Sequence, residues 1–199
     1  MASEPLGASA EASARRRLFV GVPLPVGLLA FVERSQAALP REGGLKLLRP
    51  DQLHVTLAFI GEVDGAKAAA AFAVVDSLPA SSGGAAEITG FLMLPSPRKA
   101  RVAALALDDH DGVFAALFER VMGGLEAAGV MTREGRPFRP HLTIARLKTP
   151  GPVQPRSESG RAQYAIESVC LYSSELSREG ARYAVLTRAV FDQTSGRKV

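Results

Sequence analysis

The sequence contains one four-residue pattern twice: histidine, aliphatic residue, threonine, aliphatic residue, at 54–57 (HVTL) and again at 141–144 (HLTI). Side chains of a β-strand alternate between its two faces, so each segment, as a strand, directs its histidine and threonine to one face and its aliphatic residues to the other. Two of the chain's three histidines lie in this pattern. We therefore predict two similar strands, each with a polar face for chemistry and an apolar face for a core.

Hydrophobic alternation, turn residues and capping residues predict an α+β fold. We expect strands at 18–22, 53–60, 88–94, 101–107, the second motif, 162–172 and 181–191, and helices at 26–39, 64–78 and 113–128, the last two capped by Asp64 and Asp111. Loops are expected at 81–84 and 149–160. Each motif has a helix nearby, which suggests a bilobal, pseudo-symmetric fold with antiparallel sheets lining a central cleft and helices on the outside. The expected organisation is a disordered tail at 1–14, one two-lobed domain at 15–191 and a C-terminal tail at 192–199.

Composition limits the classes of protein to which the chain can belong. With 199 residues, 47% of them hydrophobic and 22% charged, it can bury one sizeable core. Its net charge of +4 suits an anionic ligand, but the absence of Trp and the presence of only three Tyr argue against an extended nucleic-acid stacking surface. Without a signal-peptide stretch or an apolar run of roughly 20 residues, we expect a cytoplasmic protein that contacts no membrane. We also expect a monomer without an obligatory protein partner, and a buried structural role for the single cysteine, Cys170.

Two facing imidazoles can divide a proton transfer, because a neutral ring accepts a proton from water while a protonated ring supplies one to a leaving oxygen. The threonine hydroxyls on the same faces can donate hydrogen bonds to the oxygens of a phosphodiester. A zinc site normally takes three or four protein ligands, and neither motif has a further ligand in phase with its histidine. We therefore favour catalysis without a metal or cofactor. A single such pair would more often be structural, and the second copy shifts the preference to catalysis.

Four segments carry a resemblance to the two-histidine phosphoesterases, and in particular to the LigT/ThpR-type RNA 2',3'-cyclic phosphodiesterases of the 2'-5' RNA ligase family. They are RLFV at 17–20, LHVTLAFIGE at 53–62, FRPHLTIAR at 138–146 and LYSSEL at 171–176, within a similarity that covers about residues 15 to 191. The resemblance implies a bilobal α+β fold and metal-independent hydrolysis of RNA 2',3'-cyclic phosphate ends to 2'-phosphate ends. RNA ends or oligonucleotides with a cyclic phosphate are then the expected partners. Reversible 2'-5' RNA ligation and a non-catalytic nucleotide-binding module are the alternatives.

The resemblance also implies roles for the motif residues. His54 would be the general acid for the departing 3' oxygen and His141 the general base for water. Thr56 and Thr143 would donate hydrogen bonds to the phosphate.

Two further residues are expected to bind substrate. Arg146 matches a basic position after the second motif, but strict alternation puts it on the face opposite His141, so it needs a bulge or a strand end to join the site. A solvent-facing arginine is the alternative. Phe19 matches a base-contacting position, with a place in the core as the alternative. The third histidine, His110, lies in an acidic turn and is expected to be an exposed loop residue.

Overall fold

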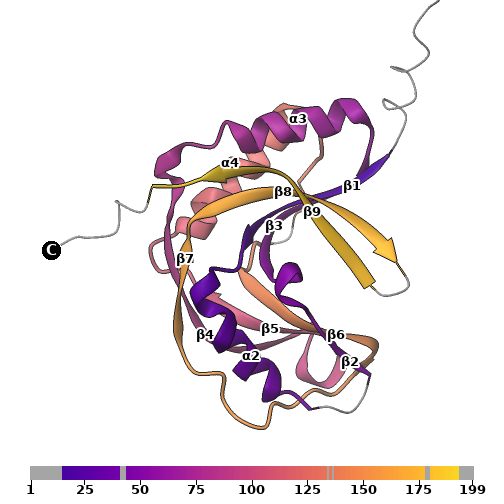
Figure 1. The fold of residues 1–199 in the computed structure, drawn as a ribbon, viewed down its shortest axis with the longest axis vertical. Coiled ribbons are helices and arrows are strands. Elements are labelled where there is room, and N and C mark those ends of the chain that lie inside the picture. The colour runs from indigo at the N-terminus through magenta and orange to yellow at the C-terminus, as the bar shows by residue number, and fades with distance from the viewer. Residues whose placement is uncertain (1–14, 41–43, 134, 136, 178–179, 193–199) are drawn as a thin grey trace, which may run out of the picture.

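Antiparallel strands make up most of the fold (Figure 1). The structure is a computed structural model that describes residues 15–40, 44–133, 135, 137–177 and 180–192. The tail expected at 1–14, and that expected at 192–199 except for Asp192, lie outside these residues. The strands are β1 (Arg16–Pro23), β2 (Leu45–Leu47), β3 (His54–Val63), β4 (Gly84–Leu94), β5 (Ala100–Asp108), β6 (His141–Gly151), β7 (Ala162–Ile166), β8 (Ser168–Ser177) and β9 (Gly180–Val190). The helices are α2 (Leu29–Ala37), α3 (Gly65–Asp76) and α4 (Val113–Ala127), with 3-10 turns η1 (Val26–Leu28), η2 (Pro50–Gln52), η3 (Ala80–Ser82) and η4 (Pro97–Lys99).

The strands form one continuous antiparallel sheet in the order β7-β4-β5-β6-β3-β1-β8-β9, and β2 pairs with β6 in addition. The two motif strands, β3 and β6, are neighbours at the middle of this order. Their junction divides the order into two halves of four strands, β7-β4-β5-β6 and β3-β1-β8-β9. The α+β class and the antiparallel, pseudo-symmetric arrangement are therefore confirmed, with the two halves joined through a single curled sheet.

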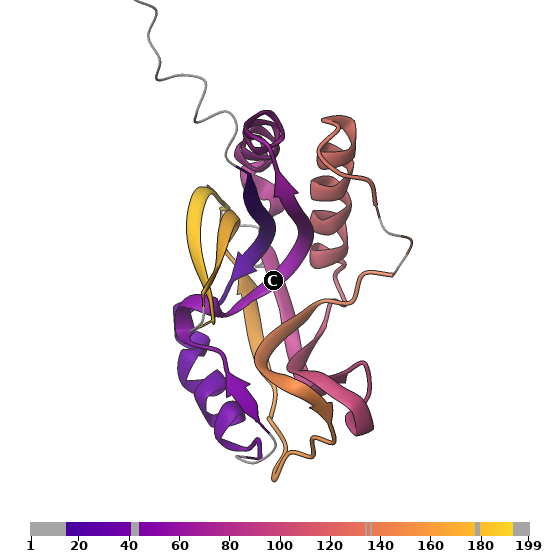
Figure 2. The same cartoon turned by 90° about the vertical axis from the view of Figure 1, so that its right-hand side faces the viewer.

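The helices lie on the outside of the sheet (Figures 1 and 2). Helix α4 contacts β3 and α3, while α3 contacts β8 and β9 and α2 contacts β6. Helix α2 therefore covers the half that contains the second motif, although it follows β1 in the chain.

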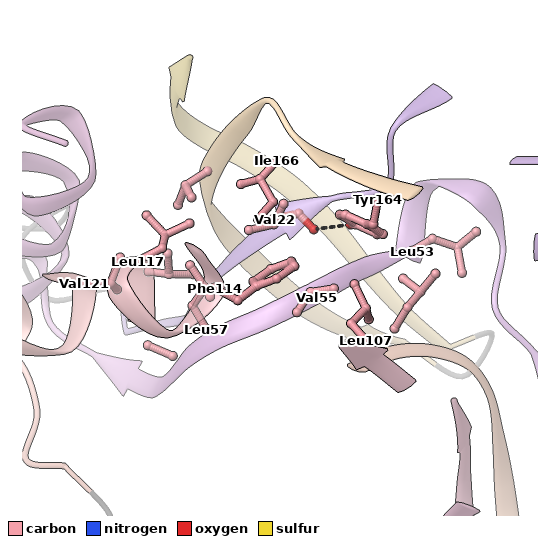
Figure 3. Packing of buried hydrophobic residues seen from close by; sticks show 14 of the residues in the cluster. Val22, Leu53, Val55, Leu57, Leu107, Phe114, Leu117, Val121, Tyr164 and Ile166 are labelled. Carbon is pink, nitrogen blue, oxygen red and sulfur yellow. Dashed lines mark hydrogen bonds between the residues drawn. The ribbon is translucent and has the colours of Figure 1, made fainter. Parts of the chain in front are cut away.

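The aliphatic residues of both motifs lie in one hydrophobic core. Val55, Leu142 and Ile144 are fully buried and Leu57 is 4% exposed. Val55 and Leu57 share their cluster with Phe114 and Leu117 of α4 (Figure 3). Full burial of an aliphatic side chain of this size stabilises a fold by about 1.5–3 kcal/mol, so these positions anchor each motif strand.

A buried tyrosine ties the edge strand of one half of the sheet to a strand of the other half. The single hydroxyl proton of Tyr164 on β7 is shared between two carbonyl oxygens of β1, that of Val22 at 3.1 Å (Figure 3) and that of Pro23 at 2.9 Å. Because β7 and β1 are far apart in the sheet order, this contact curls the sheet.

One of the two predicted helix caps is confirmed and the other is wrong. The side chain of Asp64 accepts a hydrogen bond from the backbone N–H of Lys67 at 2.9 Å, as expected for a cap. At the start of α4 the N-cap is Gly112, with φ 67°, and the carboxylate of Asp109 rather than Asp111 accepts from the backbone N–H groups of 114 and 115. The left-handed turn at Gly112 brings the earlier aspartate over the helix end.

Several strand boundaries also differ from the predictions. Strand β4 begins at Gly84, inside the predicted loop, because its pairing with β7 supplies hydrogen bonds that the Gly-Ala-Ala sequence does not signal. Strand β6 continues to Gly151, and the strand predicted at 162–172 is divided into β7 and β8. Strand β2 was not predicted. No helix in the described part of the chain is long and apolar enough to span a membrane.

Candidate active site

The two motifs meet at the junction of β3 and β6. Val55 pairs directly with Leu142 in an antiparallel register. In such a pair the flanking residues face each other, so His54 lies across from Thr143, and Thr56 lies across from His141. These four polar side chains are half-buried on the face opposite the core, which is the arrangement that alternation predicts for each strand.

Each motif strand contains a β-bulge at the residue after its threonine. Gly21 pairs with Thr56 but the next residue of β1 towards the N-terminus, Val20, pairs with Ala58, so the intervening Leu57 is the extra residue on β3. On β6 the extra residue is 144, because Ala104 pairs with 143 and Ala103 pairs with 145. In both strands the extra residue and its successor are buried together, which reverses the alternation that follows.

The reversal places Arg146 on the face of His141 and Thr143, so the bulge on which its predicted role depends is present. The side chain of Arg146 is exposed. Its positive charge also acts on His54, whose pKa it lowers. The geometry brings Arg146 to the site, and its contact with substrate stays a prediction.

The bulge on β6 is held by a side chain from α2 that the sequence analysis did not single out. The amide of Gln36 donates to the carbonyl of Ile144 at 2.9 Å and to that of Leu48 at 2.8 Å. The carbonyl of Ile144 also accepts from the backbone N–H of Leu48 at 2.9 Å. Gln36 thus adds a second donor to the carbonyl of Ile144 and ties α2 to the bulge.

The two imidazole rings are anchored in the same way. Nδ1 of His54 lies 2.9 Å from the carbonyl oxygen of Gln52, and Nδ1 of His141 lies 2.8 Å from that of Arg139. A carbonyl oxygen only accepts, so each Nδ1 carries a proton and donates it. The other nitrogen, Nε2, is left in both rings as the atom that can accept or supply a proton in a reaction.

His54 has the more enclosed environment. Burial lowers its pKa from 6.5 to about 4, and the charges of Arg146 and His141 act in the same direction, while the hydrogen bond to Gln52 opposes the shift. His54 is therefore neutral near pH 7 in the free protein. Arg146 and His141 therefore lie near enough to His54 for their charges to act on its ring.

Phe19 lies behind His54. Its ring stacks on the imidazole with 4.7 Å between ring centroids, and it also stacks on Tyr172 at 4.7 Å. Phe19 is only 3% exposed, so its contacts are with protein rings, and this burial favours the core alternative over the predicted contact with a base. Cys170 is buried beside it, and His110 is exposed and lies next to Asp108.

Phe59 is a residue on the face of the motif histidines that the sequence analysis did not single out. It follows the bulge of β3 just as Arg146 follows the bulge of β6, so it lies on the face of His54 and Thr56. It is 53% exposed, and the guanidinium of Arg17 lies 4.9 Å from its ring centroid. The signal available was the equal spacing: both residues are the fifth after their motif histidine.

The described residues include no group of three or more His, Cys, Asp and Glu side chains that could hold a metal ion. The polar groups gathered at the junction are two imidazoles, two hydroxyls and one guanidinium. This set can bind an anion and move protons on both sides of it.

Comparisons with known proteins agree with this architecture. A profile of the family described as LigT like Phosphoesterase matches residues 22–104. An RNA 2',3'-cyclic phosphodiesterase of Thermus thermophilus is 30% identical over 92% of this chain and 93% of its own length. The crystal structure of TT0787 of Thermus thermophilus has a TM-score of 0.74 at 28% identity and covers 88% of this chain and 97% of that one. The crystal structure of Escherichia coli LigT complexed with 3'-AMP has a TM-score of 0.71 at 26% identity and covers 90% of this chain and 100% of that one. The chain therefore belongs to the LigT-like phosphoesterase family.

Proposed function

We propose that this protein hydrolyses RNA 2',3'-cyclic phosphate ends to 2'-phosphate ends, using His54 and His141 as a proton-transfer pair. The observation that carries the proposal is the meeting of two His-Thr pairs at one strand junction, each with its Nδ1 fixed and its Nε2 available. The names of the Thermus thermophilus and Escherichia coli relatives support the same substrate.

In the proposed reaction His141 acts as the general base. Its Nε2 takes a proton from a water molecule that attacks phosphorus, and the bond from phosphorus to the 3' oxygen breaks. His54 supplies a proton to that oxygen, which leaves as a hydroxyl, and the 2' ester bond remains. The hydroxyls of Thr56 and Thr143 donate to the non-bridging oxygens, where negative charge accumulates in the transition state.

The acid role of His54 requires a proton that the free protein does not hold at neutral pH, because its pKa is about 4. A phosphodiester carries a negative charge, and a nearby negative charge favours imidazolium. We therefore infer that His54 takes up a proton when the phosphate binds between the motifs. Protonation of the acid is then coupled to the presence of substrate.

Arg146 and Phe59 complete the proposed substrate contacts. Arg146 adds a permanent positive charge on the same face as the motif residues and suits the phosphate. Phe59 offers an exposed ring at the equivalent place on β3, and bases at RNA ends can stack on such rings. The described residues include no group of three or more His, Cys, Asp and Glu side chains that could hold a metal ion, and the proposed mechanism uses none.

The test is to incubate the purified protein with an RNA that ends in a 2',3'-cyclic phosphate, with and without a chelator. We expect a 2'-phosphate product at equal rates in both, and product formation roughly 10²- to 10⁴-fold slower from a His141→Ala control. A 3'-phosphate product would contradict the assigned leaving group. Binding without turnover would favour a non-catalytic nucleotide-binding module, and chelator-sensitive turnover would overturn the metal-free mechanism.

A further inference from the structure

The two motif histidines have different neighbours, because the strand of His54 is flanked by β1 and the strand of His141 is flanked by β5. Gly21 of β1 pairs with Thr56 in the way that Ala104 of β5 pairs with Thr143. A Cβ atom at Gly21 would lie 3.1 Å from Cδ2 of His54 and 3.0 Å from a backbone carbonyl oxygen. The His54 ring thus rests against β1 at a place where a methyl group would press on it, whereas β5 already carries a methyl group at the equivalent position.

The next outward-facing position on the same strands differs as well. Phe19 pairs with Phe59 on one side, and Val102 pairs with Arg146 on the other. His54 can therefore stack on an aromatic ring from its neighbouring strand, while His141 has an aliphatic residue in the corresponding place.

Two tyrosines extend this ring contact into an enclosure. Tyr183 meets His54 edge-on at 5.4 Å between ring centroids, and Tyr172 lies at 5.7 Å. Phe19, Tyr172 and Tyr183 are in mutual contact, and we call these three residues the aromatic wall. Within the described part of the chain, no aromatic ring packs against His141.

Tyr172 and Tyr183 lie on the hairpin formed by β8 and β9, and this hairpin also reaches the backbone that anchors His54. The amide of Gln52 donates to the carbonyl of Ala181 on β9 at 2.7 Å, and its side-chain oxygen accepts from the backbone N–H of Arg49 at 3.0 Å. Gln52 is also the residue whose carbonyl oxygen holds Nδ1 of His54. Because Gln52 is only 6% exposed, its side chain fixes the short turn before β3 to the hairpin.

We propose that the β8–β9 hairpin is a positioning element for His54, acting on its ring through Tyr172 and Tyr183 and on its backbone anchor through the Gln52–Ala181 hydrogen bond. The hairpin makes the two otherwise equivalent histidines unequal and keeps His54 neutral until an anion enters. This inference rests on the proposed function, which needs one histidine of each kind.

Electrostatics around His54 agree with this role. The charged and titratable groups that act on it or on its wall are His141 and Arg146 from β6, Tyr172 and Cys170 from β8, and Tyr183 and Arg188 from β9. Burial raises the pKa of both Tyr172 and Cys170, so these groups are neutral. No carboxylate is among the described groups that act on His54. Burial is the largest cause of its low pKa, and the aromatic wall packs against the buried ring.

The experiment replaces the half-buried Tyr183 in the full-length protein with Phe or with Leu and follows the His54 ring by NMR as pH is varied, without substrate. We expect the pKa of His54 to rise by about one unit or more in Tyr183→Leu, because loss of the wall admits water, and to stay unchanged in Tyr183→Phe. We expect kcat to fall roughly 10- to 100-fold in Tyr183→Leu, as for a displaced catalytic group, with Tyr183→Phe restoring it. Val185→Ala on the same strand is the matched control, since Val185 is 47% exposed and makes no ring contact with His54.

The titration and the activity assay separate two kinds of failure. An unchanged His54 titration in a folded Tyr183→Leu protein would overturn the positioning role even if hydrolysis is confirmed. A shifted titration in a protein that does not hydrolyse cyclic phosphates would support the hairpin's effect on His54 and reject the proposed function. If Tyr183→Leu fails to fold, Gln52→Leu tests the other contact, and equal His54 titration and kcat in that variant and the wild type would overturn the proposal.

Discussion

The environment of His54 predicts a specific loss of stability in acid. An unfolded chain protonates this ring with a pKa near 6.5, whereas the folded protein does so only near pH 4. Between these values the unfolded state binds more protons, so the free energy of unfolding decreases as pH falls. The stabilisation is fully present above pH 6.5 and is lost progressively towards pH 4. From about pH 8 to about pH 5, the His54 contribution falls by roughly 2 kcal/mol, at 1.36 kcal/mol per pKa unit.

The assay is urea unfolding of the wild-type protein and of His54→Asn at both pH values, with the free energy of unfolding extrapolated to water. Carboxylates with lowered pKa, such as Asp51, lose their contributions equally in both proteins and cancel in the comparison. The wild type should lose roughly 2 kcal/mol more than the variant on acidification. His110→Asn is the control, because the His110 side chain is 76% exposed. On acidification this variant should lose as much free energy of unfolding as the wild type. Equal losses in the wild type and His54→Asn would refute the reasoning.

Other perturbations test other parts of the site and fold. Alanine in place of His54 or His141 should each lower kcat for a cyclic phosphate substrate by roughly 10²- to 10⁴-fold, and a near-normal rate from either would exclude that ring from proton transfer. Gly21→Ala puts a Cβ 3.1 Å from the His54 ring and should lower kcat by roughly 10-fold or more, while Gly123→Ala, where the added atom meets nothing within 4 Å, should keep full activity. Tyr164→Phe removes the hydrogen bonds to β1 at 3.1 and 2.9 Å and should lower the free energy of unfolding by about 1–3 kcal/mol in urea titrations, and an unchanged value would contradict its role in curling the sheet.

Features set by local pattern could be predicted from the sequence. Alternation within 54–57 and 141–144 identified both motif strands and correctly assigned their aliphatic residues to the core. The helix after Asp64 followed from its capping residue and an alanine-rich run. These predictions need only the conformational preferences of a few consecutive residues.

Features set by partners distant in the chain could not be predicted. The bulges at Leu57 and Ile144 arise from the pairing of β3 with β1 and of β6 with β5. Nothing in the local sequences HVTL and HLTI indicates that one residue of each strand is left out of this pairing. The bulge on β6 further depends on Gln36, which is 108 residues away from the carbonyl that it binds. Because the bulges were not predicted, strict alternation put Arg146 on the wrong face of its strand. Phe59 was not predicted as a site residue, although it follows His54 at the same spacing at which Arg146 follows His141.

The repeated bulge and the different neighbours of the two histidines have distinct consequences for the chemistry. The bulge gives the two motif strands the same arrangement, because in both strands it puts the fifth residue after the histidine on the face of that histidine. General acid and base catalysis by two imidazoles requires the two rings to differ, since one ring must hold a proton while the other lacks it. The inequality enters through the flanking strands, where Gly21 and Phe19 enclose one ring while Ala104 and Val102 stand beside the other. Residues that break the internal symmetry therefore make the two rings chemically unequal, and the negative charge of a bound phosphate must then reverse the neutral state of His54 before this ring can act as the acid.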